Sequence, residues 1–176
     1  IFQQMLMETG QLQKIWETID PFWIDHLKFM VNTRIRKGEM INLLWSNVSL
    51  SETNPTITVA STSDWKTKTR KSRTIPLNKT AYEIILRWKD RHLRYVFTQK
   101  EGGKIHPDKP YHALITALRK LNLTGNIHKL RHAFASKLVM SAVDLYSVKE
   151  LLGHSNIETT QIYAHLSQQH LQAAVA

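Results

Sequence analysis

Apolar side chains recur every three or four residues along most of this chain, which is the spacing of a helix with one buried face. Residues 11–31 show it first, interrupted at Asp20 and Pro21, where proline favours the start of a new helix. Asn126 is placed to cap a later helix at its start, and Gly153 to end another. The same spacing predicts helices over residues 37–44, 79–92, 111–121, 127–140, 144–152, 156–164 and 167–174.

Three short segments break the helical pattern early in the chain. Residues 48–50, 56–60 and 72–76 are rich in β-branched side chains, roughly alternate between apolar and polar positions, and are separated by polar turns. They predict a small antiparallel sheet. The fold class expected from the sequence is therefore mainly α with a small antiparallel β-sheet (α+β).

The net charge of the chain indicates a possible binding partner. Of the 176 residues, 24 are Lys or Arg and 14 are Asp or Glu, so the formal net charge is +10. Such an excess favours a polyanion, of which nucleic acid is the commonest, although a basic protein without a special partner also fits.

Cysteine is absent, which excludes disulfides, thiolate metal sites and a cysteine nucleophile. This fits a reducing compartment, and we expect a cytoplasmic protein. No run of about 18 apolar residues marks a membrane span, and no signal peptide opens the chain, so no membrane partner is expected. Because the chain begins at Ile1, we expect a fragment of a longer protein.

Two polar pairs and one tyrosine are candidates for chemistry. Arg36 and Glu39 stand three residues apart, as do His128 and Arg131, so the members of each pair share a helix face. Either pair is also common on an inert helix surface, where an ion pair contributes little. Tyr163 lies in an apolar run near the end of the chain, where a packed core tyrosine is the ordinary interpretation.

A basic segment lies between the second and third expected strands. Its side chains either contact phosphates or protect an exposed sheet edge. If the strands extend into it, alternation places Lys66, Lys68 and Arg70 on one side. The cations of this segment are Lys66, Lys68, Arg70, Lys71 and Arg73.

Taken together, these motifs resemble those of the tyrosine recombinases, the phage integrase family. The resemblance covers about residues 30–166 and implies that residues 1–176 form a single catalytic domain, without the N-terminal DNA-binding domain that family members carry. The motifs that carry it are Arg36, Lys68 within 68–77, His128-Lys-Leu-Arg131-His132, Leu151-Leu-Gly-His154-Ser and Tyr163-Ala-His165.

The resemblance implies a site-specific recombinase or integrase that cuts and rejoins DNA strands. Tyr163 would attack the scissile phosphate, form a 3′-phosphotyrosine and free a 5′-hydroxyl. Arg36 and Arg131 would bind the phosphate oxygens, with Glu39 supporting Arg36. The remaining roles are His128 as general base, Lys68 as general acid and His154 as a further hydrogen-bond donor.

The resemblance also implies the partners. Double-stranded DNA would be bound through Lys66, Arg70, Lys71 and Arg73, by a homo-oligomer that is a tetramer on DNA and a monomer as an isolated domain. No cofactor and no metal are implied. The isolated chain should bind DNA weakly and in a salt-sensitive way.

The sequence departs from the family pattern at three positions. Arg34 stands where the family has a glycine before the first arginine, so the local turn can differ, and Arg34 becomes an alternative to Arg36 as phosphate ligand. The spacing to Glu39 favours Arg36. Lys129 and Ala142 replace a frequent acidic or small residue and a frequent glycine.

Three other interpretations compete with recombination. His128 and His132 have the spacing of a zinc-binding helix, but Lys129 occupies the place of the glutamate in such a motif and would oppose a metal ion. A type IB topoisomerase would use the same chemistry to relax DNA without a partner duplex. A non-catalytic DNA-binding module would have the same fold and bind DNA without cutting it.

Overall fold

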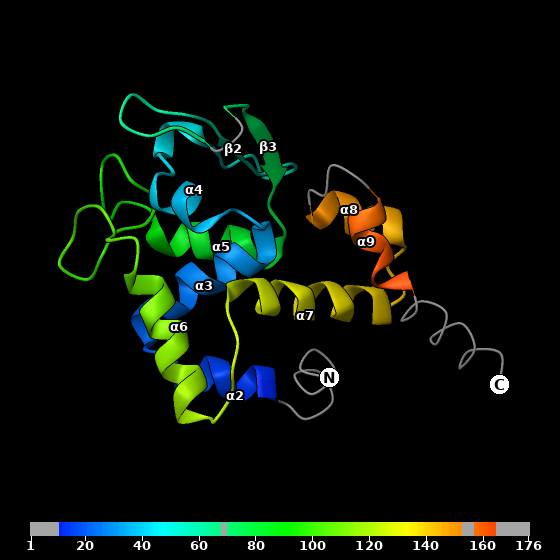
Figure 1. Ribbon diagram of the computed structural model, residues 1–176. Helices are drawn as coiled ribbons and strands as arrows, with labels where there is room; N and C mark the ends of the chain where they lie inside the picture. Colours follow the sequence, from blue (N-terminus) through cyan, green and yellow to red (C-terminus); the bar gives the residue numbers. More distant parts are fainter. Residues whose placement is uncertain (1–10, 68–69, 153–156, 165–176) are drawn as a thin grey trace, which may run out of the picture.

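The computed structural model describes residues 11–67, 70–152 and 157–164 (Figure 1). The expected fold class, mainly α with a small antiparallel sheet, is confirmed. The helices are α2 (Gln11–Thr18), α3 (Pro21–Thr33), α4 (Lys37–Ile41), η1 (Trp45–Asn47), α5 (Lys79–Trp88), α6 (Lys109–Lys120), α7 (Ile127–Met140), α8 (Leu145–Leu152) and α9 (Glu158–Gln161). The strands are β1 (Val48–Ser49), β2 (Thr56–Val59) and β3 (Arg73–Pro76).

Local capping explains several helix boundaries. The Asp20 carboxylate accepts a hydrogen bond from the Phe22 amide at 3.0 Å, and Pro21 occupies the first turn of α3, as the sequence predicts. Asn126 caps α7 by accepting from the Lys129 amide at 3.0 Å, which confirms its expected role. Helix α3 ends at Thr33, and the next residue, Arg34, caps it with a left-handed φ of 59°.

Other boundaries differ from the prediction. The helix expected over 37–44 ends at Ile41, the one over 79–92 ends at Trp88, and α6 begins at Lys109, with proline in its first turn. The turn after α4 is closed by the Leu43 amide, which donates to the carbonyl of Met40 rather than to that of Glu39. Gly153 and the helix expected over 167–174 lie outside the described residues.

The sheet has the strand order β1-β2-β3, and both pairings are antiparallel, as expected. Its strands are short: β2 pairs with β3 from Thr56–Pro76 to Val59–Arg73. Before Arg73, the strands do not extend into the described part of the basic segment, so the condition under which alternation would place Lys66, Lys68 and Arg70 on one side is not met. Just before this segment the chain bends instead, and the Thr62 amide donates to the carbonyl of Trp65 at 2.7 Å.

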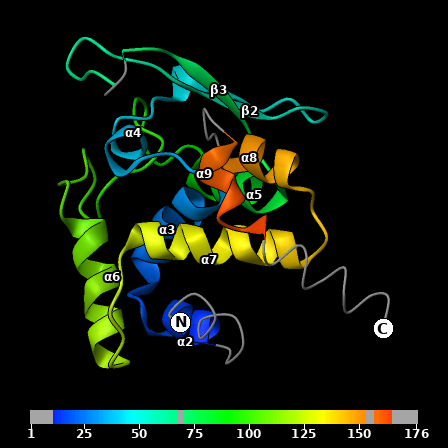
Figure 2. The ribbon, with the colours of Figure 1, turned by 45° about the vertical axis from the view of Figure 1, so that its right-hand side comes forward.

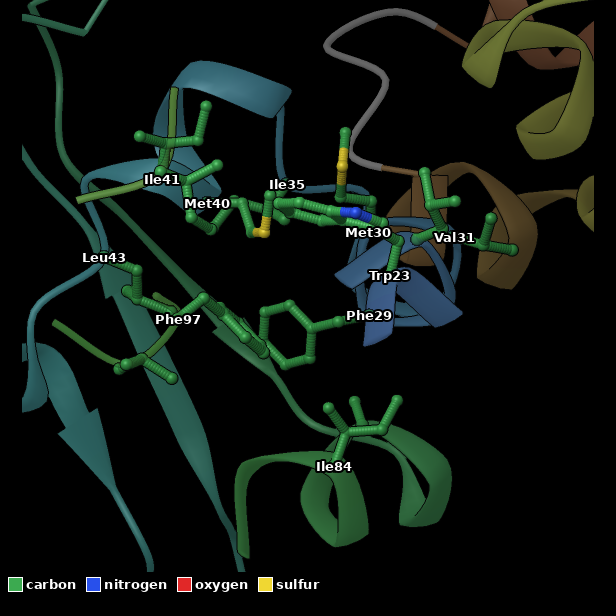
Figure 3. Packing of buried hydrophobic residues seen from close by; sticks show 14 of the residues in the cluster. Trp23, Phe29, Met30, Val31, Ile35, Met40, Ile41, Leu43, Ile84 and Phe97 are labelled. Atoms are coloured by element: carbon green, nitrogen blue, oxygen red, sulfur yellow. The ribbon is translucent and has the colours of Figure 1, made fainter. Parts of the chain in front are cut away.

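Helix α3 is at the centre of the main core. Phe29 and Ile35 are completely buried, and with Met40, Ile84 and Phe97 they join α3, α4 and α5 (Figure 3). A second, smaller cluster joins α7, α8 and the chain after α9 through Ala135, Val139, Val148 and Tyr163.

Figures 1 and 2 show how these parts are arranged. Helices α8 and α9 lie along α7 on the side that faces the sheet, whereas α2 lies on the opposite side of α7. The chain after α9, which carries Tyr163, therefore lies on the same side of α7 as the sheet. Within the described part of the chain, no helix is both long and apolar enough to cross a membrane.

His26 makes the stability of this core sensitive to pH. Its ring is completely buried, and its two nitrogens face the carbonyls of Phe22 and Thr98 at 3.1 and 3.2 Å. Burial lowers its pKa from 6.5 to about 4, although the two carbonyls favour the charged ring. The folded protein therefore holds His26 neutral, while the unfolded chain takes up a proton as the pH falls below 6.5.

We expect the free energy of unfolding to be highest above pH 6.5 and to fall by about 3 kcal/mol as the pH is lowered to 4. Urea unfolding at a series of pH values measures this loss. A His26→Phe variant should lack most of the slope, whereas His112→Gln, at an exposed site on α6, should keep it. An equal slope in all three proteins would contradict the assignment.

Candidate active site

Arg36 is placed by the turn between α3 and α4. It is the residue before α4, and its amide donates to Glu39 Oε2 at 2.8 Å, while its Nη1 lies 3.5 Å from Oε1. The expected pairing of Arg36 with Glu39 is thus present. The Arg36 side chain is 52% exposed, so its guanidinium faces solvent beside a buried carboxylate.

Arg34 has a different place from Arg36. Its left-handed backbone ends α3, and its amide donates to the carbonyl of Met30 at 3.0 Å. Glycine adopts this conformation without strain, which accounts for a glycine at this position in the family pattern. Arg34 therefore keeps the turn, and the residue beside Glu39 is Arg36.

Glu39 has a second and closer cation in Arg73, the first residue of β3. Arg73 Nη1 donates to Oε1 at 2.9 Å and Nη2 to Oε2 at 2.5 Å. Burial by itself would raise the pKa of the Glu39 carboxyl, but the hydrogen bonds from Arg73 and from the Arg36 amide outweigh it and hold the pKa below its ordinary value. Glu39 is therefore ionised, and it ties the sheet to α4.

Three other cations of the basic segment are open to solvent. Lys66, Arg70 and Lys71 are exposed, and Arg70 has a left-handed φ of 56°. Lys68 lies outside the described residues. Contact of these cations with DNA remains a prediction.

Helix α7 carries the His-x-x-Arg motif. His128 is exposed in its first turn, and His132, one turn later, is half-buried. Arg131 lies between them on the same helix, but its side chain is not among those described, and His154 lies outside the described residues. The joint placement of all the predicted catalytic side chains therefore stays a prediction.

Tyr163 lies against α7. Its side chain is 2% exposed and packs in the cluster with Ala135, Val139 and Val148. A hydrogen bond joins its hydroxyl to Nδ1 of His132. Burial raises the pKa of Tyr163 to about 12, so the phenol is protonated at neutral pH in this arrangement.

Two contacts at this site were missed by the sequence interpretation. From the sequence, His132 belongs to the recombinase motif and to a possible zinc motif but has no catalytic role, and Arg73 is expected either to contact DNA or to protect a sheet edge. The position of His132, directly after the Arg of the His-x-x-Arg motif, was the signal available for the first. No sequence signal paired Arg73 with a carboxylate 34 residues away.

The zinc-helix interpretation gains no support at His132, whose Nδ1 faces a tyrosine hydroxyl. Among the residues that the structure describes, no three His, Asp or Glu side chains stand close enough together to hold a metal ion.

Comparison with known sequences extends the resemblance to almost the whole chain. The sequence pattern of the phage integrase family matches residues 6–170. A tyrosine recombinase XerC of Alcanivorax borkumensis is 32% identical over 147 residues, which cover 78% of this chain and 45% of the relative. The chain spans about half the length of the recombinases it matches.

Solved structures agree on the fold. The catalytic domain of bacteriophage HP1 integrase superimposes with a TM-score of 0.65 at 22% identity, over 96% of this chain and 92% of that domain. The Tn1549 transposon integrase, solved in complex with circular intermediate DNA, superimposes with a TM-score of 0.69 at 19% identity, over 89% of this chain and 61% of that one. On its sequence and its fold, this chain belongs to the phage integrase family.

Proposed function

We propose that this chain is the catalytic part of a site-specific DNA recombinase that cuts and rejoins strands through a 3′-phosphotyrosine intermediate. The observation that carries the proposal is the contact between the Tyr163 hydroxyl and His132, one turn after His128 on α7. It puts a phenol beside the helix that bears the His-x-x-Arg motif. The matched relatives are recombinases, which favours strand exchange over topoisomerase activity.

Arg36 and Arg131 bind the non-bridging oxygens of the scissile phosphate in this proposal. Negative charge gathers on those oxygens in the transition state, and guanidinium groups stay charged at any working pH. The exposure of the Arg36 side chain beside buried Glu39 supports this role, because it leaves donors for an external anion. His154 adds a further donor.

Tyr163 is the nucleophile, and a histidine takes its proton. The phenol oxygen attacks phosphorus, the bond from phosphorus to the 5′-oxygen breaks, and Lys68 supplies the proton for the leaving oxygen. His128 was expected to be the base, but the contact on Nδ1 makes His132 the better candidate. Because Tyr163 is covered, it must leave its packing on α7 before it reaches a phosphate.

The partner is double-stranded DNA, and exchange requires a second copy of the protein on a partner duplex. The near-complete overlap with a phage integrase catalytic domain supports treating residues 1–176 as one catalytic domain. We propose a tetramer on DNA, in which Lys66, Arg70 and Lys71 contact phosphates. The reaction needs no metal or nucleotide, because the phosphotyrosine conserves the energy of the broken bond.

The proposal is tested by covalent capture on nicked duplexes, whose cleaved end diffuses away and leaves the adduct trapped. A random-sequence duplex pool at low salt supplies a substrate even though the natural site is unknown. We expect a stable adduct whose yield is unchanged by EDTA. Loss of the adduct with EDTA and its return with a divalent metal would refute metal independence. Absence of any adduct at low salt would refute the proposed function itself.

A further inference from the structure

The Glu39 carboxylate is bound more closely by the Arg73 guanidinium than by the Arg36 guanidinium. Arg73 donates from both terminal nitrogens, at 2.9 and 2.5 Å, to the two carboxylate oxygens. The Arg36 guanidinium contributes one contact, at 3.5 Å, which is at the limit of a hydrogen bond. The stronger side-chain partner is therefore Arg73, because two parallel N–H donors on a carboxylate form the strongest such geometry.

A buried carboxylate needs this neutralisation. The Glu39 side chain is 2% exposed, and an ionised carboxylate removed from water must be paired with a cation or lose its charge. Without Arg73, the nearest described cation would be Arg36, whose amide already holds Glu39 at 2.8 Å. The guanidinium of Arg36 would then turn onto Glu39 and use the donors that a phosphate requires.

We propose that Arg73 is a positioning residue for Arg36: it occupies the Glu39 carboxylate and so keeps the Arg36 guanidinium available to bind a phosphate. The inference rests on the proposed function in one respect, the assignment of Arg36 as a phosphate ligand. It changes the expected role of Arg73 from a direct DNA contact to control of a neighbouring arginine.

The surrounding contacts allow Arg73 to be replaced without loss of the local fold. The Arg73 backbone stays paired with Val59 in the sheet. Trp65, in the segment after β2, lies over Gly38 of α4. Its ring is close enough that a side-chain Cβ at position 38 would contact it at 3.6 Å. The sheet and its connection therefore remain held on α4 by groups other than the Arg73 guanidinium.

The first test measures the single-turnover rate of adduct formation on the nicked duplex that the native chain captures best. Arg73→Met should lower this rate about 100-fold, the size of effect expected when a transition-state donor is lost, with DNA affinity within about threefold of native. Arg73→Lys should keep most of the rate, because a cation still neutralises Glu39. Adding Glu39→Gln to Arg73→Met should restore the rate at least about tenfold, since a neutral amide does not capture Arg36.

The matched control is Arg87→Met. Arg87 holds Asp25 through two hydrogen bonds, at 2.6 and 3.2 Å, between α5 and α3. This pair has a similar geometry but does not involve α4, so its loss should leave the rate of adduct formation unchanged. A fall in rate equal to that of Arg73→Met would assign the effect to general destabilisation and overturn the proposal.

Two further results would overturn it. If Arg73→Met with Glu39→Gln is no faster than Arg73→Met alone, Arg73 does not act through the charge of Glu39. Arg73 is instead a phosphate contact if Arg73→Met weakens DNA binding and reduces the slope of log K against log salt concentration by about one.

A test without DNA separates this inference from the proposed function. Arg36→Met should lower the urea midpoint of unfolding only slightly in the native background, because Arg73 neutralises Glu39. In the Arg73→Met background the same change should lower it much more, because Arg36 has become the cation that Glu39 depends on. Equal losses in the two backgrounds would contradict the inference even if the chain proves to be an active recombinase.

Discussion

Replacing Tyr163 by phenylalanine is expected to abolish the covalent adduct between protein and DNA. The substitution removes the attacking oxygen, so the rate of adduct formation should fall by at least about 1,000-fold. DNA affinity should change little, because the hydroxyl contacts His132 and is covered by protein rather than exposed. Adduct yield on the captured nicked duplex and a gel-shift assay measure the two quantities separately.

Tyr146→Phe is the matched control for this experiment. Tyr146 lies on α8 in the same part of the molecule, but it is 66% exposed and stands beside Lys149. It should form adduct at the native rate. Retention of adduct by Tyr163→Phe, or its loss in Tyr146→Phe, would show that the nucleophile has been assigned to the wrong residue.

The second large effect is expected at Arg36. Arg36→Lys should lower the rate of adduct formation by about 100- to 1,000-fold, because an ammonium cannot reproduce two parallel donors aimed at phosphate oxygens. The loss should lie in the rate at saturating DNA more than in affinity, since the charge is retained. Single-turnover kinetics over a range of protein concentrations separate the two.

Arg119→Lys, at an exposed position in the last turn of α6, controls for the general change of arginine to lysine. It should leave the rate unchanged. A loss in Arg36→Lys that is confined to affinity would mean that Arg36 only attracts the duplex. The same change made at Arg34 should mainly affect stability, because Arg34 closes α3.

Local features of the sequence predicted most of the fold. The helix start at Pro21, the cap at Asn126 and the three strand positions depend on residues within a few positions of each other, and the structure has all of them. Strand length was not predictable in the same way. The strands stop at Val59 and Arg73, and in the described chain between them the Thr67 amide donates to the Ser61 hydroxyl at 3.1 Å, a contact that alternation does not encode.

In the site, too, contacts between residues close in sequence were predicted and contacts between distant residues were not. The pairing of Arg36 with Glu39 was predicted from their spacing of three residues, although Arg36 stands just before α4 and its closest contact with Glu39 is through its backbone amide. The bonds from Arg73 to Glu39 and from His132 to Tyr163 join residues 34 and 31 positions apart, so they depend on how the sheet meets α4 and how the chain after α9 packs against α7. A periodic pattern cannot specify such contacts, and two of the most informative partners in the site were therefore assigned other roles from the sequence.

The central claim is that the Tyr163 oxygen becomes bonded to a DNA phosphorus. The most direct measurement is mass spectrometry of the captured adduct after digestion of both protein and DNA. The peptide that contains Tyr163 should carry a nucleotide through its 3′-phosphate, with fragment ions that locate the added mass on the tyrosine. A nucleotide attached to any other residue, or one linked through a 5′-phosphate, would contradict the account.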